Sequence, residues 1–334
     1  MPYEAAIIQT ASARLERRRE QRDRARYKLE RALYDQAPRL REIDTALRGT
    51  MAELAMLAAG PRPVAADGPE IAAIRARNGQ LQAERARLLE ALGYGPGALD
   101  DAPACPLCGD TGWAEGHMCA CLRQLCAQEQ LKALTDAMHL TEEQDFDRLR
   151  LDIYSDQPWN GGRSPRETMR RVIAVCGSYA RQFPDFESKN LLLSGNTGLG
   201  KTYLSGCIAR EVSQRGYSVV YDTAIHLFTA FETRRFTRDA GEERQARDDT
   251  RRYLGCDLLI LDDLGSELTT PLSQSSLYEV VNSRLQSGRH TILSTNLSMD
   301  HIAQRYTPQL ASRIGGLYQE LTFYGDDLRL LRSL

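Results

Sequence analysis

Residues 195–202, GNTGLGKT, have the residue types and spacing of a phosphate-binding loop. Such a loop wraps backbone N–H groups around phosphate oxygens, so a Cβ at its glycines would obstruct the approach or the turn. The Lys201 ammonium can reach the β and γ phosphates of a nucleotide, and the Thr202 hydroxyl can ligate Mg²⁺. We assign the whole loop to nucleotide binding: Gly195, Asn196, Thr197, Gly198, Leu199, Gly200, Lys201 and Thr202.

Two acidic residues, Asp262 and Asp263, end a second apolar run, LLILDD at residues 258–263. Carboxylates at the end of a buried strand stand where the Walker B acids of ATPases belong. We expect Asp262 to hold Mg²⁺ through water and Asp263 to occupy the position of the water-activating acid. Glu267, four residues further on, is a weaker candidate for polarising or coupling.

A third apolar run, HTILSTN at residues 290–296, ends in Asn296, whose amide could orient the attacking water near the γ-phosphate. Downstream, residues 302–316 contain Arg305 and Arg313. A hydrolysing subunit in a ring or filament commonly borrows an arginine from its neighbour, and Arg313 is our choice for that finger. An ordinary turn asparagine and surface arginines are the alternatives.

Four of the eight cysteines lie within residues 105–121, as a CxxC pair and a CxC pair. The glycines between the pairs can bring them together, and a closed set of four thiolates is typical of structural zinc. The sequence therefore predicts a zinc site with ligands Cys105, Cys108, Cys119 and Cys121. His117 or Cys126 could replace one thiolate, and a redox dithiol is a further alternative. The separate cysteines are interpreted as buried thiols without chemistry: Cys176, Cys207 and Cys256.

Composition narrows the class of protein. The chain has 334 residues, of which 26% are charged. Because its net charge is -2, nucleic-acid binding would depend on a local patch of basic side chains. No run of about eighteen apolar residues is present, and the N-terminus lacks the order of a secretory signal. We expect a cytoplasmic protein that does not bind membranes.

Residues 10–92 show helical composition, with apolar residues at seven-residue spacing: Leu33, Leu40, Leu47 and Leu54, then Ile74, Leu81 and Leu88. Prolines and glycines in residues 59–69 would turn the chain, so we expect two long helices in an antiparallel hairpin or coiled coil. The arginine-rich segment from residue 14 could contact nucleic acid, but interspersed acids favour a solvated coiled-coil face. We interpret the hairpin as a partner-binding arm.

From about residue 166, helical segments alternate with short apolar runs, as in the buried parallel strands of an α/β sheet. The predicted fold is an α/β P-loop ATPase core preceded by a helical hairpin and a small zinc-binding module. The predicted divisions are residues 1–100 for the hairpin, 101–128 for the zinc module, 129–165 for a linker and 166–334 for the core.

One segment of the core, residues 227–238, interleaves aromatic and basic side chains. Aromatic faces stack on bases and arginines contact phosphates, so the segment is a candidate for single-stranded DNA binding. Phenylalanines at helical spacing are, however, more often part of a core. The residues concerned are Phe228, Phe231, Phe236, Arg234, Arg235 and Arg238.

The motif set resembles the bacterial helicase-loader family of AAA+ ATPases, of which DnaC and DnaI are members. The resemblance runs over residues 141–334, through the phosphate loop, DDLGSE, STN and SRIGG. It implies a self-associating AAA+ core that uses ATP and Mg²⁺, and the cysteine segment ahead of the core resembles the zinc-bearing N-terminal modules of some loaders, which hold Zn²⁺. Such a protein would bind a hexameric replicative helicase through its N-terminal region and deliver it to single-stranded DNA.

The resemblance also has departures. Asp263 replaces the glutamate that most AAA+ proteins carry there, which implies slow, switch-like hydrolysis. Too few residues follow Thr202 for a full helical lid, and Arg329 is a weak candidate for a second sensor. Transposition helpers of the IstB type share the core, and a non-catalytic adaptor is a third reading. The long N-terminal region disfavours the transposition helper. The two aspartates, Asn296 and Arg313 disfavour the non-catalytic adaptor.

Overall fold

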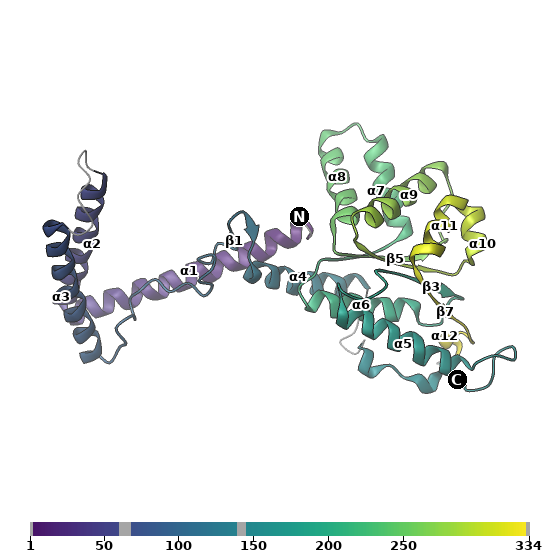
Figure 1. Ribbon diagram of the computed structural model, residues 1–334, viewed down its shortest axis with the longest axis horizontal. Coiled ribbons are helices and arrows are strands. Elements are labelled where there is room, and N and C mark those ends of the chain that lie inside the picture. The colour runs from purple at the N-terminus through teal and green to yellow at the C-terminus, as the bar shows by residue number, and fades with distance from the viewer. Residues whose placement is uncertain (1–2, 60–67, 139–144, 332–334) are drawn as a thin grey trace. The chain divides into compact units, whose positions relative to one another are not determined.

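The computed structural model describes residues 3–59, 68–138 and 145–331 (Figure 1). The chain divides into two compact units, one formed by Met1–Ser12 with Ala120–Leu334 and the other by Ala13–Cys119. The first four helices are α1 (Ala5–Gln36), α2 (Pro38–Ala59), α3 (Pro69–Ala91) and α4 (Ala120–Met138). A short antiparallel hairpin of β1 (Trp113–Ala114) and β2 (His117–Met118) lies between α3 and α4.

The N-terminal helices differ from the predicted pair of long helices. Three helices are present, because Pro38 ends the first one and begins the next. Proline has no N–H to donate to the preceding turn, and its ring clashes with the carbonyl four residues earlier. The end of α1 stays close to α2 and α3, since Leu33, Leu40 and Leu89 are fully buried in one apolar cluster.

Helices α2 and α3 form the antiparallel hairpin that the sequence predicts. Arg39 near the start of α2 pairs with Glu84 near the end of α3, and Glu53 near the end of α2 pairs with Arg77. Pairs of this order require the two helices to run in opposite directions. The predicted turn at residues 59–69 lies largely outside the described residues.

The remaining elements build the core in an alternating order. The 3₁₀ turns are η1 (Phe146–Arg148) and η2 (Leu151–Ile153), and the strands are β3 (Asn190–Gly195), β4 (Val219–Thr223), β5 (Leu258–Leu264), β6 (His290–Thr295) and β7 (Gln319–Phe323). The helices are α5 (Pro165–Gln182), α6 (Lys201–Gln214), α7 (Ala224–Phe236), α8 (Ala240–Gly255), α9 (Pro271–Gln286), α10 (Met299–Arg305), α11 (Pro308–Leu317) and α12 (Leu328–Leu331).

The five core strands form one parallel sheet in the order β4-β5-β6-β3-β7. Both faces are covered by helices (Figure 1), so the strands are apolar on both sides. Within β3, Leu191 and Leu193 join the cluster with α5 and α6, whereas Leu192 joins the cluster with α7 to α11. This confirms the predicted α/β P-loop core. Beyond β7, the described chain contains one further helix, the short α12.

Helix α4 crosses residue 128, where the sequence suggested a boundary. Its Gln130 is buried, donates a hydrogen bond to Ser213 Oγ of α6 at 2.7 Å, and accepts one from the Val219 N–H at 2.9 Å. The start of the segment expected to be a linker is therefore fixed to the core. Among the residues that the structure describes, no helix has the length and apolar character needed to cross a membrane.

Candidate nucleotide site and metal centre

The phosphate loop lies between β3 and α6, and its glycines have no room for side chains. Gly195 has φ of 140°, and a Cβ there would lie 2.1 Å from the carbonyl oxygen of Phe323 on β7. Gly198 has φ of 75°, and a Cβ there would lie 1.8 Å from Oδ1 of Asp327. Backbone strain and lack of space both require glycine at these positions.

Lys201 begins α6 and folds back over the loop. Its Nζ donates hydrogen bonds to the carbonyl oxygens of Gly195 and Asn196, both at 2.7 Å. Burial lowers the pKa of Lys201, and the carboxylates of Asp262 and Asp263 act in the opposite direction. Asn196 and Thr197 are exposed at the tip of the loop, whereas Leu199 is buried beneath it.

Thr202 and Asp262 are in direct contact although 60 residues separate them in the chain. The Thr202 hydroxyl donates to Asp262 Oδ2 at 2.8 Å, and the same oxygen accepts a hydrogen bond from the Tyr221 hydroxyl. Asp262 is 7% exposed. A threonine hydroxyl beside a buried carboxylate is a suitable oxygen donor set for Mg²⁺, which coordinates through one or two carboxylates and retained water.

Asp263 interrupts the regular strand. Its φ is 55°, in the left-handed region that non-glycine residues seldom adopt, and the register between β5 and β6 shifts between Leu261 and Leu264. This bulge turns the Asp263 side chain out, so that it is exposed beside the buried Asp262. Strained backbone of this kind concentrates at functional sites.

Asn296 directly follows β6. The register places Thr295, the last residue of β6, beside Ser194 of β3 on one side and Leu264 of β5 on the other. Asn296 is exposed and stands at the same edge of the sheet as the phosphate loop and the two aspartates. The structure thus brings the predicted loop, acids and asparagine together.

Arg313 is not among these residues. It lies on α11, where its Nη2 donates to the Tyr278 hydroxyl at 3.2 Å and its guanidinium lies over the Tyr278 ring at 5.4 Å from the centroid. Arg305 instead points inward and binds Glu267, through the Glu267 carbonyl oxygen and an ion pair of 3.9 Å.

Glu267 is buried and its carboxylate is held by hydrogen bonds. Its carboxylate accepts hydrogen bonds from the Gly265 N–H at 2.9 Å and from the Tyr306 hydroxyl, and the residue is 7% exposed. These contacts connect the turn after β5 to α10. A polarising or coupling role for Glu267 stays a prediction.

Three side chains that sequence reasoning missed contact the loop or its acids. Tyr221 binds Asp262, and Tyr154 donates from its hydroxyl to the Leu199 carbonyl at 3.0 Å. Asp327 lies against Gly198, and the N–H of the following Leu328 donates to the Gly198 carbonyl at 3.1 Å. These residues are far in sequence from the loop and the acids, so no local motif identifies them. Only a prediction that β4 pairs with β5 in this register could have placed Tyr221 beside Asp262.

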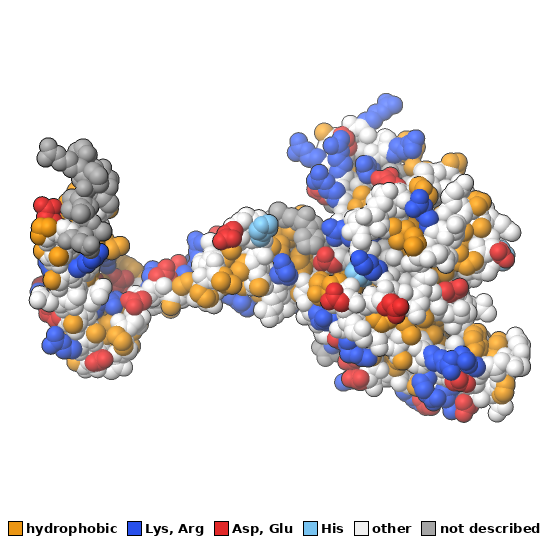
Figure 2. All heavy atoms as spheres, viewed as in Figure 1, with side chains coloured by type: hydrophobic (Ala, Val, Ile, Leu, Met, Phe, Trp, Pro, Cys, Tyr) orange, Lys and Arg blue, Asp and Glu red, His pale blue; other side chains and the backbone are white. Residues whose placement is uncertain are grey.

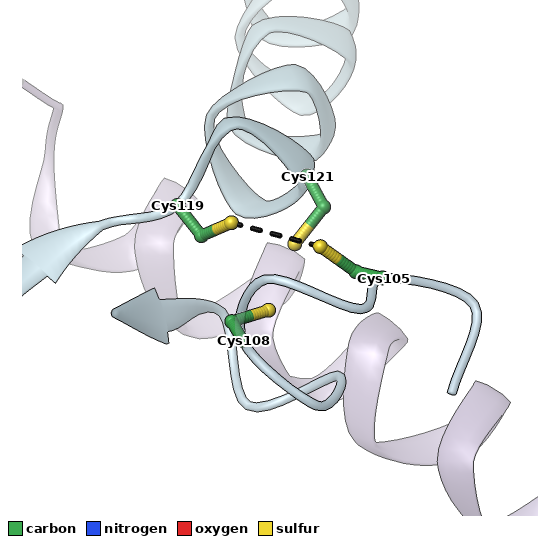
Figure 3. A group of neighbouring side chains, drawn as sticks. All are labelled: Cys105, Cys108, Cys119 and Cys121. Atoms are coloured by element: carbon green, nitrogen blue, oxygen red, sulfur yellow. Dashed lines mark hydrogen bonds between the residues drawn. The ribbon is translucent and has the colours of Figure 1, made fainter. Parts of the chain in front are cut away.

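The four predicted cysteine ligands form one cluster (Figure 3). The Sγ atoms of Cys105, Cys108, Cys119 and Cys121 all lie within 4.8 Å of one another, and those of Cys105 and Cys119 are 3.7 Å apart. A tetrahedral zinc with Zn–S bonds of about 2.3 Å requires sulfur separations of about 3.8 Å. The donor set and its size therefore fit a structural zinc.

The local chain is shaped for this cluster. Asp110, with φ of 61°, accepts hydrogen bonds from the N–H groups of Ala104 at 3.0 Å and Cys105 at 2.8 Å, and it pairs with Arg22. Of the described residues, only the four cysteines meet at this point. His117 and Cys126 lie outside this cluster of ligand atoms, so the described structure favours the four-cysteine set over a replacement by either residue.

The candidate DNA segment is corrected in part by the structure. Phe228 and Phe231 are 9% and 5% exposed and pack in the core, so they cannot stack on bases. Phe236 is 65% exposed at the end of α7. Basic side chains gather over α7 and α8 (Figure 2), around a hollow of about 380 Å³ lined by Arg234, Arg247 and Arg251. Two glutamates, Glu243 and Glu279, also line it and pair with Arg247 and Arg234.

Known proteins resemble the core. Residues 181–314 match a family model described as IstB-like ATP binding protein. The replicative helicase loader DnaC of Escherichia coli (strain K12) is 26% identical over 148 residues, which are 44% of this chain and 58% of that protein. The putative ATP-binding protein of insertion sequence IS1162 from Pseudomonas fluorescens is 31% identical over 137 residues, 40% of this chain and 54% of that protein.

Among solved structures, a crystal structure of the DnaC helicase loader is similar, with 20% identity and a TM-score of 0.42 over 54% of this chain and 98% of that one. The chain thus matches between half and three fifths of the length of these curated relatives. The family match lies on the phosphate loop, the aspartates and Asn296, which are the residues that the fold brings together. Residues 181–314 therefore form a domain that matches the IstB-like family of ATP-binding proteins and is similar in sequence to the loader DnaC.

Proposed function

We propose that this protein is an ATP-dependent helicase loader, which binds a hexameric replicative helicase and delivers it to single-stranded DNA. The observation that carries the proposal is the convergence of Lys201, Thr202, Asp262 and Asn296 at one sheet edge, in a domain similar to DnaC. The four-cysteine cluster and the helical hairpin ahead of that domain supply the additional surfaces that a loader needs.

The residues of the site divide the work of binding and hydrolysis. The loop N–H groups and the Lys201 ammonium compensate phosphate charge, and Thr202 and Asp262 would hold Mg²⁺, which when bound neutralises charge on the β and γ phosphates. Asp263 is exposed where it can take a proton from the attacking water, and Asn296 can orient that water. The short side chain of Asp263 accords with slow hydrolysis.

Arg313 is proposed to act on a neighbouring subunit. It lies on α11, where its side chain contacts Tyr278. A guanidinium supplied in trans stabilises the charge that develops on the γ-phosphate. Hydrolysis would then require self-association through the core.

The hairpin is proposed to bind the helicase and the basic surface to bind DNA. Met51 and Met56 of α2 are 66% and 74% exposed, an apolar character suited to a partner helix. On the core, Phe236 and the arginines of α7 and α8 offer one stacking surface and several phosphate contacts.

A second candidate is an ATPase helper of DNA transposition. It is favoured by the IstB-like family model and by the similarity to the IS1162 protein. The two candidates share the nucleotide site and differ in the partner.

A capture experiment separates them. The full-length chain, immobilised with ATP, is offered a purified replicative helicase and, separately, the transposase of an insertion sequence such as IS1162. We expect capture of the helicase alone. Capture of the transposase alone would replace the loader function with the transposition helper.

A further inference from the structure

Tyr221 lies on β4, the edge strand beside β5. The parallel register places Thr223 opposite Asp262 and Tyr221 opposite Ile260. The Cα of Tyr221 therefore lies two residues short of the level of Asp262 along the sheet. Its ring packs with the apolar cluster on the α6 face of the sheet, and its hydroxyl reaches the carboxyl end of β5 to bind Asp262 Oδ2.

The Asp262 carboxylate is held by donors from different elements. Oδ2 accepts from Thr202 on α6 and from Tyr221 on β4, and Oδ1 accepts from the backbone N–H of Asp263 at 3.0 Å. A buried carboxylate without such donors would lose its hydration without compensation. Tyr221 is the one side chain among these donors that is not already assigned to the nucleotide site.

The chemistry of the donor matters here. An ammonium or guanidinium beside Asp262 would compete with Mg²⁺ for the carboxylate charge. A phenol donates one hydrogen bond and leaves that charge in place. A tyrosine hydroxyl is protonated at neutral pH, so Tyr221 acts toward Asp262 as a hydrogen-bond donor.

We propose that Tyr221 is a positioning residue of the nucleotide site: its hydroxyl fixes the orientation in which Asp262 receives the hydrated Mg²⁺ of a bound nucleotide. This inference rests on the proposed ATP-binding function. It assigns Tyr221 no contact with the nucleotide itself. Loss of its hydroxyl should therefore weaken the response to the metal and leave metal-free binding unchanged.

The test measures nucleotide affinity rather than turnover. A fluorescent, non-hydrolysable ATP analogue is titrated onto the full-length protein with Mg²⁺ and with EDTA, and the ratio of the two affinities is the readout. For Tyr221→Phe we expect that ratio to fall about tenfold, the lower range for a hydrogen bond to a charged group. The affinity in EDTA should equal that of the parent.

Tyr253→Phe is the matched control. Tyr253 is fully buried and Tyr221 is half-buried, and the Tyr253 hydroxyl likewise donates to a carboxylate, Asp222 Oδ2, at 2.7 Å. Its removal should leave the Mg²⁺ ratio unchanged, and thermal unfolding compares the loss of stability in the two variants. A double-mutant cycle with Asp262→Asn adds a second criterion, because Tyr221→Phe should have little further effect on the ratio once the carboxylate is gone.

The outcomes are distinct. A parent-like Mg²⁺ ratio in Tyr221→Phe overturns the inference and leaves the nucleotide site standing. An equal loss of affinity with and without Mg²⁺ also overturns it, because the tyrosine would then act through packing alone. A parent protein whose affinity for the analogue does not respond to Mg²⁺ contradicts the proposed ATPase site, and the inference with it.

Discussion

Lys201 is the residue on which nucleotide binding depends most directly. Its Nζ lies over the loop, bound to two carbonyl oxygens that it can exchange for phosphate oxygens. Without that ammonium, the β and γ phosphate charge is uncompensated in a partly buried site. We predict that Lys201→Ala lowers affinity for a fluorescent ATP analogue by about tenfold or more, on the scale of one hydrogen bond between charged groups.

Lys189→Ala serves as the control for that measurement, since Lys189 is exposed just before β3 and outside the loop. It should bind the analogue as the parent does. Equal affinities in Lys201→Ala and the parent, with both proteins folded by circular dichroism, would show that the loop does not hold phosphate.

Arg313 is predicted to act between subunits. Arg313→Ala should bind ATP normally and hydrolyse it about 1,000-fold more slowly or worse, because an arginine finger contributes only in the transition state. Mixing Arg313→Ala with Lys201→Ala should restore some hydrolysis, since the first supplies an intact loop and the second an intact arginine. Steady-state phosphate release from the mixture measures this.

A mixture no more active than its components would place the finger elsewhere. Arg305 is a poor substitute, because its guanidinium is already bound to Glu267 within its own chain. Arg305→Ala should chiefly lower the temperature of unfolding.

Residues that form the site through local motifs could be identified from sequence, and residues that reach it through register could not. The loop is contiguous, and Asp262 and Asn296 end recognisable strands. Tyr221 and Tyr154 depend on which strand neighbours β5 and on how the segment before α5 passes the loop. Neither fact is encoded in spacing along the chain.

At the level of elements, the pattern of apolar residues predicted the strands of the sheet better than it predicted the N-terminal helices. Apolar runs identified the core strands, because parallel strands are buried on both faces. The break at Pro38 was missed, since the heptad pattern continues through Leu33 and Leu40 across the proline. Phe228 and Phe231 were ambiguous, as helical spacing alone does not say which face of α7 is buried.

The cysteine module should depend on metal, because a short segment with a two-stranded hairpin has little apolar core of its own. We predict one zinc per chain by elemental analysis of the full-length protein. Cys108→Ser and Cys121→Ser should each lose zinc, whereas Cys126→Ser, a buried cysteine outside the cluster, should retain it. Zinc-free parent protein with four titratable thiols in this module and an unchanged far-ultraviolet spectrum would contradict a metal site.

For the whole molecule, the division into units affects how partner binding is tested. Residues 1–12 belong with the ATPase core, where the Tyr3 hydroxyl donates to the Gly216 carbonyl at 2.6 Å and Glu4 pairs with Arg252 at 2.7 Å. Cutting the chain after the zinc module would remove these contacts from the core. Point variants of the intact chain are therefore the better probes.

We predict that helicase capture and DNA binding can be lost separately. Met51→Asp with Met56→Asp places charges at two exposed apolar positions of α2, and should abolish helicase capture while single-stranded DNA binding persists. Arg234→Glu with Arg235→Glu should weaken DNA binding and its salt dependence, since each phosphate contact contributes to counterion release, and should leave helicase capture intact. Pulldown and fluorescence anisotropy at two salt concentrations measure the two activities. If the methionine variant lost DNA binding and the arginine variant lost the helicase, the roles of hairpin and core would be reversed, and the transposition helper would become the better description of the core.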